Sequence, residues 1–490
     1  MQTAPAPFNS DAEHMRHGWK VLGVTALGVS LCFINASTLN VALPLMAGEL
    51  GASAEQTHWI LLSYMVVMTA LIMVFGRLSD MLGRKRLYLC GLALLTLSSL
   101  GCGLSENAGT ILVFRCLQAI GAASVITNTT ALITDAFPAR ALGLGLGINS
   151  TLSAISQSIG PILGGLLILH AGWRSIFYLN VPIGLLAMLG AVYVLPSRKQ
   201  QANEPFDWWG AVLSFTALSC LVYALSVGGT QGWHSMPVLT TLIAGSLTLL
   251  VFLLLQHRNR FPLLDLKLFA DQERATAYVC VFLLCLAQTS SVLLLALFRQ
   301  NAQGVDAFAA GLSVAPMPLG MMVASALTGK LLGRCRGIQL STMGLALNTA
   351  GLLWLGYWLH ADMGAWTLGL GLAITGLGIG MFQTSNNSVV MLSVTAQRRG
   401  IANAVRSTLQ NSGMVVGAAL GLSLAFSGMS PDMHHTVYAG DALQGSEALQ
   451  DFIAGCRLAF ITLALCSFMG FVLSLRAHAT VDVRPLHPSN

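Results

Sequence analysis

The sequence predicts an all-α integral membrane protein that crosses a lipid bilayer fourteen times. The chain has 490 residues, of which 55% are hydrophobic and only 9% are charged, whereas soluble domains carry roughly 25% charged residues. Its apolar runs are continuous and about 20 residues long, the length of a membrane-spanning helix. Strands of a membrane barrel would instead alternate over about 10 residues. Because backbone polar groups must be satisfied internally in lipid, helices are the remaining architecture.

The limits of the apolar runs place each span. Charged or turn-forming residues bound every run, and an even number of spans puts both termini on one side of the membrane. We expect the fourteen helices near residues 21–45, 57–77, 87–105, 110–134, 141–169, 174–195, 208–228, 237–256, 275–298, 308–332, 339–360, 364–392, 400–427 and 452–475.

A weak internal repeat divides the spans into a 6 + 2 + 6 arrangement. Gly76–Lys85 follows the second span and Gly329–Gly337 follows the tenth, and both hold glycine, basic and apolar residues in similar order. Two parallel six-helix halves around a midplane site are typical of transporters. The expected parts are a cytoplasmic leader at 1–20, a six-helix bundle at 21–195, two inserted helices at 208–256, a second six-helix bundle at 275–475 and a cytoplasmic tail at 476–490.

The basic residues orient these spans. With the N-terminus inside, 20 of the 25 Lys and Arg residues fall in cytoplasmic segments, and only Arg174 and Arg299 fall outside. Cytoplasmic loops carry such an excess in membrane proteins. Both termini are therefore expected to be cytoplasmic. The net charge of +6 is a topology signal, and we expect no nucleic-acid partner.

Two of the longer connections between spans have distinctive sequences. Pro262–Phe269 alternates apolar and polar residues, and we expect it to lie along the cytoplasmic interface of the membrane. The external connection Ser427–Asp451 carries His434 and His435. A histidine pair can bind metal, but no third ligand has a defined spacing, so we expect a solvated loop and no metal site.

A charged motif follows the second span. Its two glycines allow a tight turn and close helix approach, its aspartate can accept from a neighbouring helix N-terminus, and its basic residues face inside. These residues are Gly76, Asp80, Gly83, Arg84 and Lys85. Asp135, at the inner end of the fourth span, and Arg140 are the expected partners in a charge cluster that locks a cytoplasmic gate.

Two further spans carry unusual residues. Arg115 and Gln118 share one face of the fourth span, and a charge within a span is usually functional, although snorkelling to the outer interface is an alternative. The fifth span contains a proline that bends a helix and small residues that allow close packing. These residues are Gly160, Pro161, Gly164 and Gly165.

These motifs resemble those of a known family. Gly76–Lys85 resembles the loop signature of the major facilitator superfamily, with Met81 where the family usually has Arg, and Gly160–Gly165 matches its antiporter signature. The fourteen-helix drug:proton antiporter branch, the EmrB/QacA type, is similar in Asn40–Pro44, Trp59–Tyr64, Trp173–Gly184 and Phe206–Gly210. The resemblance implies a polyspecific exporter of small amphipathic, often cationic compounds, driven by the proton gradient.

The chain departs from this branch at the residue that would carry the proton. Asn35 stands where the family has Asp, and no other carboxylate falls in the middle of a predicted span. An amide cannot take up and release a proton, so coupling would need another group, such as Asp135. Without a midplane counter-ion, neutral or zwitterionic substrates also become plausible.

Polar side chains remain at the predicted midplane. They are candidates for substrate binding and translocation, although some will only join helices to one another. The candidates are Asn35, Asn40, Arg115, Gln118, Asn149, Gln383, Asn386, Asn387 and Arg406. Arg406 and Arg457 have no mid-span carboxylate as a partner, which is a weak indication that the substrate carries negative charge.

The sequence therefore favours secondary active efflux of small amphipathic compounds, with proton antiport as the first expectation. The alternatives are a facilitator or exporter of a neutral or anionic metabolite without proton coupling, and a transporter-like sensor without flux. We expect no catalytic residue, no enzyme activity and no cofactor, since no reactive side chains gather at a common depth.

The expected surroundings follow from this interpretation. The chain should be a monomeric multi-pass protein of the bacterial cytoplasmic (inner) membrane, with lipid and a small-molecule substrate as its partners. A periplasmic adaptor and an outer-membrane channel are further candidate partners.

Overall fold

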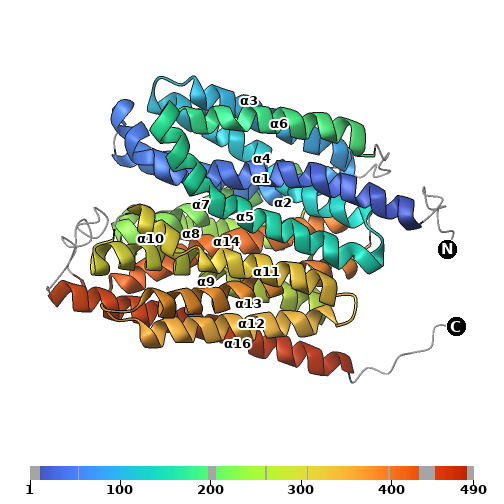
Figure 1. Ribbon diagram of the computed structural model, residues 1–490. Coiled ribbons are helices and arrows are strands. Elements are labelled where there is room, and N and C mark those ends of the chain that lie inside the picture. Colours follow the sequence, from blue (N-terminus) through green and yellow to red (C-terminus); the bar gives the residue numbers. More distant parts are fainter. Residues whose placement is uncertain are drawn as a thin grey trace.

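The computed structural model describes residues 11–52, 54–196, 206–259, 262–305, 307–395, 398–429 and 447–482, and within these ranges it is helical without a β-strand. The helices lie side by side along one long axis (Figure 1), and α1 begins at the same end of the molecule as α16 ends. We call this end the termini end and the opposite one the far end.

The helices follow the predicted spans closely. Most begin and end within about five residues of an expected span. The exceptions are α1 and α16, which extend beyond theirs at the termini end, η1, which lies in a connection, and α10 and α11, which share one span. The helices are α1 (Asp11–Glu49), α2 (Ala54–Leu82), α3 (Arg84–Gly103), α4 (Ala108–Ala136), α5 (Ala139–Ala171), α6 (Ser175–Val194), α7 (Trp208–Gln231), α8 (Met236–Arg258), the 3-10 helix η1 (Leu266–Phe269), α9 (Gln272–Gln303), α10 (Ala307–Ser313), α11 (Pro316–Leu331), α12 (Gly337–Trp358), α13 (Ala365–Leu392), α14 (Arg399–Ala425) and α16 (Glu447–Asp482).

The multi-span helical architecture is confirmed. Among the described residues, twelve helical segments are long and apolar enough to cross a membrane, and one of them runs through α10 and α11. α5, with 33 residues, and α14, with 27, are not among the twelve. The count of fourteen spans therefore stays a prediction, as does the side on which the termini lie.

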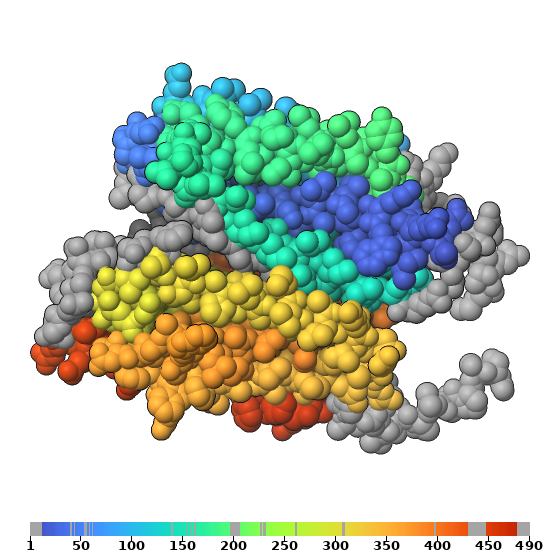
Figure 2. All heavy atoms as spheres, viewed as in Figure 1, coloured from blue at the N-terminus to red at the C-terminus, as the bar shows by residue number. Residues whose placement is uncertain are grey.

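Buried apolar side chains form two main cores. One core contains Leu95 and Ala122 and is built mostly by α1–α4 and α6. The other contains Leu352 and Phe460 and is built by α9, α11–α14 and α16. We call α1–α6 the first group and α9–α16 the second group. Figure 2 shows α5 lying against α11 where the two groups meet. α7 packs against α2 and α14, and α8 packs against α7.

The tenth predicted span is present as one apolar segment, Ala309–Leu331, in which the helix is interrupted between α10 and α11. Pro316 has no backbone N–H and cannot continue the helical hydrogen-bond ladder. The chain passes from α10 to α11 through a tighter turn, in which the Ala315 N–H donates to the Leu312 carbonyl at 3.1 Å. Apolar composition continues through this turn, so composition alone does not reveal the break.

The position of residues 262–269 along the membrane interface stays a prediction, but three leucines of this segment are buried within the protein. Leu263, Leu264 and Leu268 are buried in a protein core together with Tyr278 of α9 and Val405 of α14. The alternation of apolar and polar residues reflects burial against helices. The segment thereby ties the α7–α8 pair to the second group.

Small residues set the distance between α11 and α13. Gly376 and Gly380 lie one turn apart on α13, and each faces the backbone of α11, at Met317 and Met321. A Cβ at either glycine would overlap a carbonyl oxygen of the facing helix. Close backbone approach through small residues is a common way of packing helices in membranes.

We expect Gly376→Ala to destabilise the protein, because its methyl group meets the rigid Met317 carbonyl rather than a movable side chain. Overpacking of this kind costs about 1–3 kcal/mol, which should appear as a lower melting temperature of the detergent-solubilised protein. Gly23→Ala of α1 is the matched control, since a Cβ there meets nothing within 4 Å. Equal melting temperatures for the two variants would contradict the proposed packing.

Candidate functional site

The two groups meet closely where α2 approaches the start of α14. Gly76 faces Ala404 and the Gly400 carbonyl, and a Cβ at Gly76 would overlap the Ala404 side chain. This close approach brings the Asp80 carboxylate to the N-terminus of α14, where the Ile401 N–H donates to Asp80 Oδ2 at 3.2 Å. A helix N-terminus favours negative charge, so Asp80 holds α14 against α2.

A cluster of charges extends this contact to α3 and α4. Arg84 lies 3.5 Å from Asp80 and also pairs with Asp135, and Arg399 of α14 donates to Asp135 Oδ1 at 3.2 Å. Gly83 has a φ of 94°, a conformation that glycine adopts without strain, and this turn places Arg84 beside both carboxylates. We call Asp80, Arg84, Asp135 and Arg399 the gate cluster.

Two further residues were predicted to take part in the gate, Lys85 and Arg140, and neither is a member of the gate cluster as defined above. Lys85 Nζ donates to the Val192 carbonyl of α6 at 2.7 Å, so it joins helices within the first group. Arg140 is the second residue of α5, and its side chain lies outside the described residues. The structure brings Asp80, Arg84 and Asp135 together and adds Arg399 to them.

Further contacts close the same end of the molecule. Asn403 Nδ2 donates to the Thr127 carbonyl at 3.0 Å, and Thr151 Oγ1 donates to the Met322 carbonyl at 3.3 Å. Gly143 of α5 packs against the backbone of Gly329 in α11. These contacts between the two groups lie near the middle of the helices or toward the termini end. The interface is thus closed at that end.

The small residues of α5 pack against α1. Gly160 faces the Ser37 side chain, and Gly164 faces the backbone of Thr38, with no room for a larger residue at Gly160. Gly165 faces open space. Pro161 lies within α5, and its side chain is outside the described part of the chain. Gly160 and Gly164 therefore serve α1–α5 packing in this conformation.

A cavity lies between the two groups, beyond the closed end. It contains about 920 Å³ of space, including some open to solvent, and is lined by α1, α2, α4 and α5 of the first group and by α9, α11, α13 and α14 of the second. Its polar lining is almost entirely neutral: Thr129, Thr130, Asn149, Ser150, Ser153, Gln157, Gln288, Ser325, Gln383, Asn387, Ser407, Gln410 and Asn411. Apolar side chains such as Phe33 and Met414 complete the wall. A lining that mixes neutral polar groups with apolar side chains suits a small amphipathic molecule.

Three glutamines form a chain across the second group's side of the cavity. Gln410 Nε2 donates to Gln383 Oε1 at 3.1 Å, and Gln383 Nε2 donates to Gln288 Oε1 at 3.0 Å. Asn149 and Asn387 also line the cavity, each with a buried side-chain oxygen that has no hydrogen-bond partner. These groups are available to a ligand.

Arg406 is the one ionisable side chain among the described residues that line the cavity. It lies one turn from Gln410 on α14, and its side chain is 7% exposed. Its Nε and Nη1 atoms are buried without a hydrogen-bond partner. The cavity therefore offers a buried positive charge to whatever enters it.

Asn35 lies inside the first group rather than on this cavity wall. Its Oδ1 accepts from Asn180 Nδ2 at 3.0 Å and from Gln118 Nε2 at 3.4 Å, while its own Nδ2 has no partner. Arg115 Nη1 donates to Gln118 Oε1 at 2.9 Å, and its guanidinium stacks on the Tyr64 ring at 4.4 Å. Arg115 is 1% exposed, so it does not snorkel to the surface. The network presents donors to position 35, as a site for a carboxylate would.

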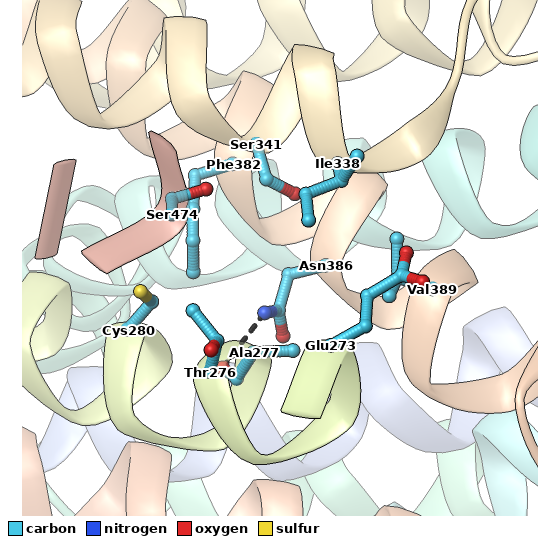
Figure 3. A pocket seen from close by; sticks show the side chains of 10 residues that line it. All are labelled: Glu273, Thr276, Ala277, Cys280, Ile338, Ser341, Phe382, Asn386, Val389 and Ser474. Carbon is cyan, nitrogen blue, oxygen red and sulfur yellow. Dashed lines mark hydrogen bonds between the residues drawn. The ribbon is translucent and has the colours of Figure 1, made fainter. Parts of the chain in front are cut away.

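Asn386 lines a different and smaller cavity inside the second group, between α9, α12, α13 and α16 (Figure 3). Its Nδ2 donates to the Ala277 carbonyl at 2.8 Å. Glu273 and Ser341 lie around the same space of about 250 Å³. The side chain of Asn40 lies outside the described residues, as do His434 and His435.

The sequence did not lead us to predict that Arg399 joins the gate cluster or that Gln410 lines the cavity. Arg399 is one of many basic residues at predicted cytoplasmic ends, where charge alone signals topology. One signal was available, because Arg399, Asn403, Arg406 and Gln410 recur every three or four residues and so share one face of α14. This polar face runs from the gate cluster into the cavity.

Comparisons with known proteins give a consistent result. A family model described as Major Facilitator Superfamily matches residues 25–418. The multidrug resistance protein Stp of Mycobacterium tuberculosis is 34% identical over 404 residues, which cover 82% of this chain and 75% of Stp. The riboflavin transporter RibZ of Clostridioides difficile is 29% identical over 409 residues, which cover 83% and 88% of the two chains.

The fold is also shared with a solved structure. The human organic anion transporter MFSD10 (TETRAN) superposes with a TM-score of 0.65 at 15% sequence identity, over 93% of this chain and 99% of that one. At this identity the likeness concerns the fold alone. The relatives and the fold are those of transporters, which are not enzymes.

We expect Arg399→Gln to loosen the termini end, because it removes one of the two arginines that Asp135 binds. Hydrogen–deuterium exchange should become faster in the first turns of α14. Arg398→Gln is the control, since the neighbouring Arg398 pairs instead with Asp265 and is largely exposed. Equal exchange in both variants would show that the gate cluster does not hold α14.

Position 35 should accept a carboxylate better than an apolar residue. Asn35→Leu leaves Asn180 Nδ2 without its acceptor, at a cost of about 1–3 kcal/mol for a buried group. Gln118 Nε2 loses its bond to position 35 and keeps the one to Ser99 Oγ at 2.8 Å. Asn35→Asp keeps both hydrogen bonds. Thermal unfolding in detergent at neutral pH should rank the wild type and Asn35→Asp above Asn35→Leu. The opposite order would mean that the network does not favour an acceptor.

Proposed function

The chain belongs to the major facilitator superfamily, and we propose that it exports small amphipathic compounds across a bacterial cytoplasmic (inner) membrane by alternating access. The observation that carries this proposal is the cavity between the two groups, lined by both and closed at one end only by contacts that can separate. The ion pairs at that end, and the contacts between helices that the glycines allow, can separate without unfolding either core. A cavity shared by two rigid halves can then open to either side.

The proposed topology has fourteen spans and two cytoplasmic termini. α1–α6 and α9–α16 are the two six-helix bundles, with α10 and α11 forming one span, and α7 and α8 are the inserted pair. The separate cores of the two groups and the peripheral packing of α8 support this division. The closed end is then the cytoplasmic one.

The direction of transport is supported by relatives rather than by geometry. Stp is named for multidrug resistance, and the glycines of the antiporter signature pack α5 against α1 here. We propose multidrug efflux by a monomer on this basis. Cooperation with a periplasmic adaptor and an outer-membrane channel is a further proposal, for which the far end of the molecule would be the docking side.

We propose proton antiport through the gate cluster. The described residues lining the cavity include no carboxylate, whereas Asp135 joins the two groups and loses its Arg399 contact when they separate. A carboxylate whose counter-ion leaves binds a proton more readily. We therefore propose Asp135 as the residue that couples proton movement to the opening of the closed end.

A second candidate is export or facilitated movement of a neutral or anionic metabolite without proton coupling. Asn35 in place of a titratable residue favours it, and RibZ, a riboflavin transporter, is a relative of similar coverage. A sensor without flux is the third candidate.

Dye transport in everted membrane vesicles distinguishes these candidates. We expect vesicles that contain the wild-type protein to accumulate a fluorescent dye when a pH gradient is imposed. In vesicles that contain Asp135→Asn, dye accumulation should no longer depend on the gradient. Asp265→Asn is the control, because Asp265 pairs with Arg398 away from the gate cluster. Asn35→Asp is tested in parallel for gain of coupling.

Each outcome decides between the candidates. Dye accumulation that does not depend on the pH gradient in wild-type vesicles would rule out proton antiport and favour the second candidate. If dye accumulation by Asp135→Asn still depends on the gradient, a residue other than Asp135 carries the proton coupling. Absence of any flux across a panel of cationic, neutral and anionic dyes would leave the sensor.

A further inference from the structure

The three arginines within the predicted spans differ in what holds them. Arg115 donates to Gln118 and to the Ile60 carbonyl and stacks on Tyr64. Arg457 donates to the Leu359 carbonyl. No hydrogen bond or ion pair with another described residue reaches Arg406, although its side chain is 93% removed from solvent. Arg406 is therefore the one of these three arginines to which the described part of the chain gives no hydrogen-bond or ion-pair partner.

Such a residue is costly unless something else compensates it. A buried charge with no partner destabilises a protein, and ionisable residues inside membrane proteins mark substrate or ion pathways. Arg406 cannot reach lipid headgroups, because it lies within the interface of the two groups and faces the cavity. The compensating group must then come from the contents of the cavity.

The surrounding side chains are suited to an anion. None of the described lining residues is acidic, so nothing within the cavity repels negative charge. Gln383 and Gln410 lie on the same wall, and Asn387 is next to them in the lining. Amide N–H groups and a guanidinium together bind carboxylates and phosphates well.

We propose that the transported compound carries an anionic group, such as a carboxylate, sulfonate or phosphate, that binds Arg406 at the closed end of the cavity. This rests on the proposed function, since it names the substrate class of the same site. The apolar part of the compound packs against Phe33, Met321 and Met414 on the remaining wall. A cationic compound of the same size is disfavoured by the same guanidinium.

Two related dyes test the charge preference with purified, detergent-solubilised protein. Fluorescein is anionic at pH 8, and rhodamine 123 has the same ring system with a net positive charge. Fluorescence anisotropy at constant salt concentration should show saturable fluorescein binding and weaker binding of rhodamine 123. In Arg406→Gln, fluorescein binding should fall roughly tenfold or more, the effect of losing a charge-assisted hydrogen bond, while Arg406→Lys should retain most of it.

Arg457→Gln is the matched control, because it removes the same charge from the same group of helices at a residue outside the cavity. It should bind fluorescein as the wild type does. The proposal is overturned if wild-type protein binds rhodamine 123 as tightly as fluorescein, if it binds neither, or if Arg406→Gln binds fluorescein unchanged.

Failure of this inference and failure of the proposed function are distinguishable. Arg406-dependent fluorescein binding without any movement of dye across vesicles would contradict export and leave the anion site in place. Transport of rhodamine 123 that is unaffected by Arg406→Gln would contradict the anion site and leave export in place.

Discussion

Asp135 is the residue on which the closed end of this protein depends. It accepts from Arg84 within the first group and from Arg399 at the start of α14, so this carboxylate, like that of Asp80, joins the two groups of helices. The Asp135 and Arg399 side chains are partly buried, each about one fifth exposed, so a charge left without a partner there is unfavourable. The gate cluster can therefore rest in only a few arrangements, paired across the interface or paired within the first group alone. A two-state contact of this kind is what alternating access requires of an otherwise well-packed helical protein.

The sequence allowed the helical segments and the first three members of the gate cluster to be predicted, because each leaves a local signal. Length and apolarity locate a span, and the spacing of Gly76, Asp80, Gly83 and Arg84 places charges at one helix end. The helix break at Pro316 was not predicted, because the residues on both sides of it are equally apolar. The burial of Leu263 and Leu268 was not predicted, because apolar and polar residues alternate in the same way whether the apolar face meets lipid or protein.

The binding groups were harder to predict, for a reason that lies in the packing. Gln288, Gln383 and Gln410 come from three helices and form one chain only because α9, α13 and α14 meet. Conversely, Asn35 and Asn386 have the same local signal as the cavity residues, yet each is turned into the interior of its own group. A polar residue in a span signals that it needs a partner; the tertiary structure decides whether that partner is a helix or a ligand.

The unpartnered guanidinium of Arg406 also has an electrical consequence. The empty cavity carries one positive charge, and the same cavity holding a monoanion carries none. A membrane potential acts with about 2.3 kcal/mol per elementary charge per 100 mV, so it would act on the empty carrier and not on the loaded one. In an inside-negative cell the potential would then return the empty site toward the cytoplasm after each delivery. Voltage could in this way drive outward transport of an anion without a titratable residue at the centre of the membrane.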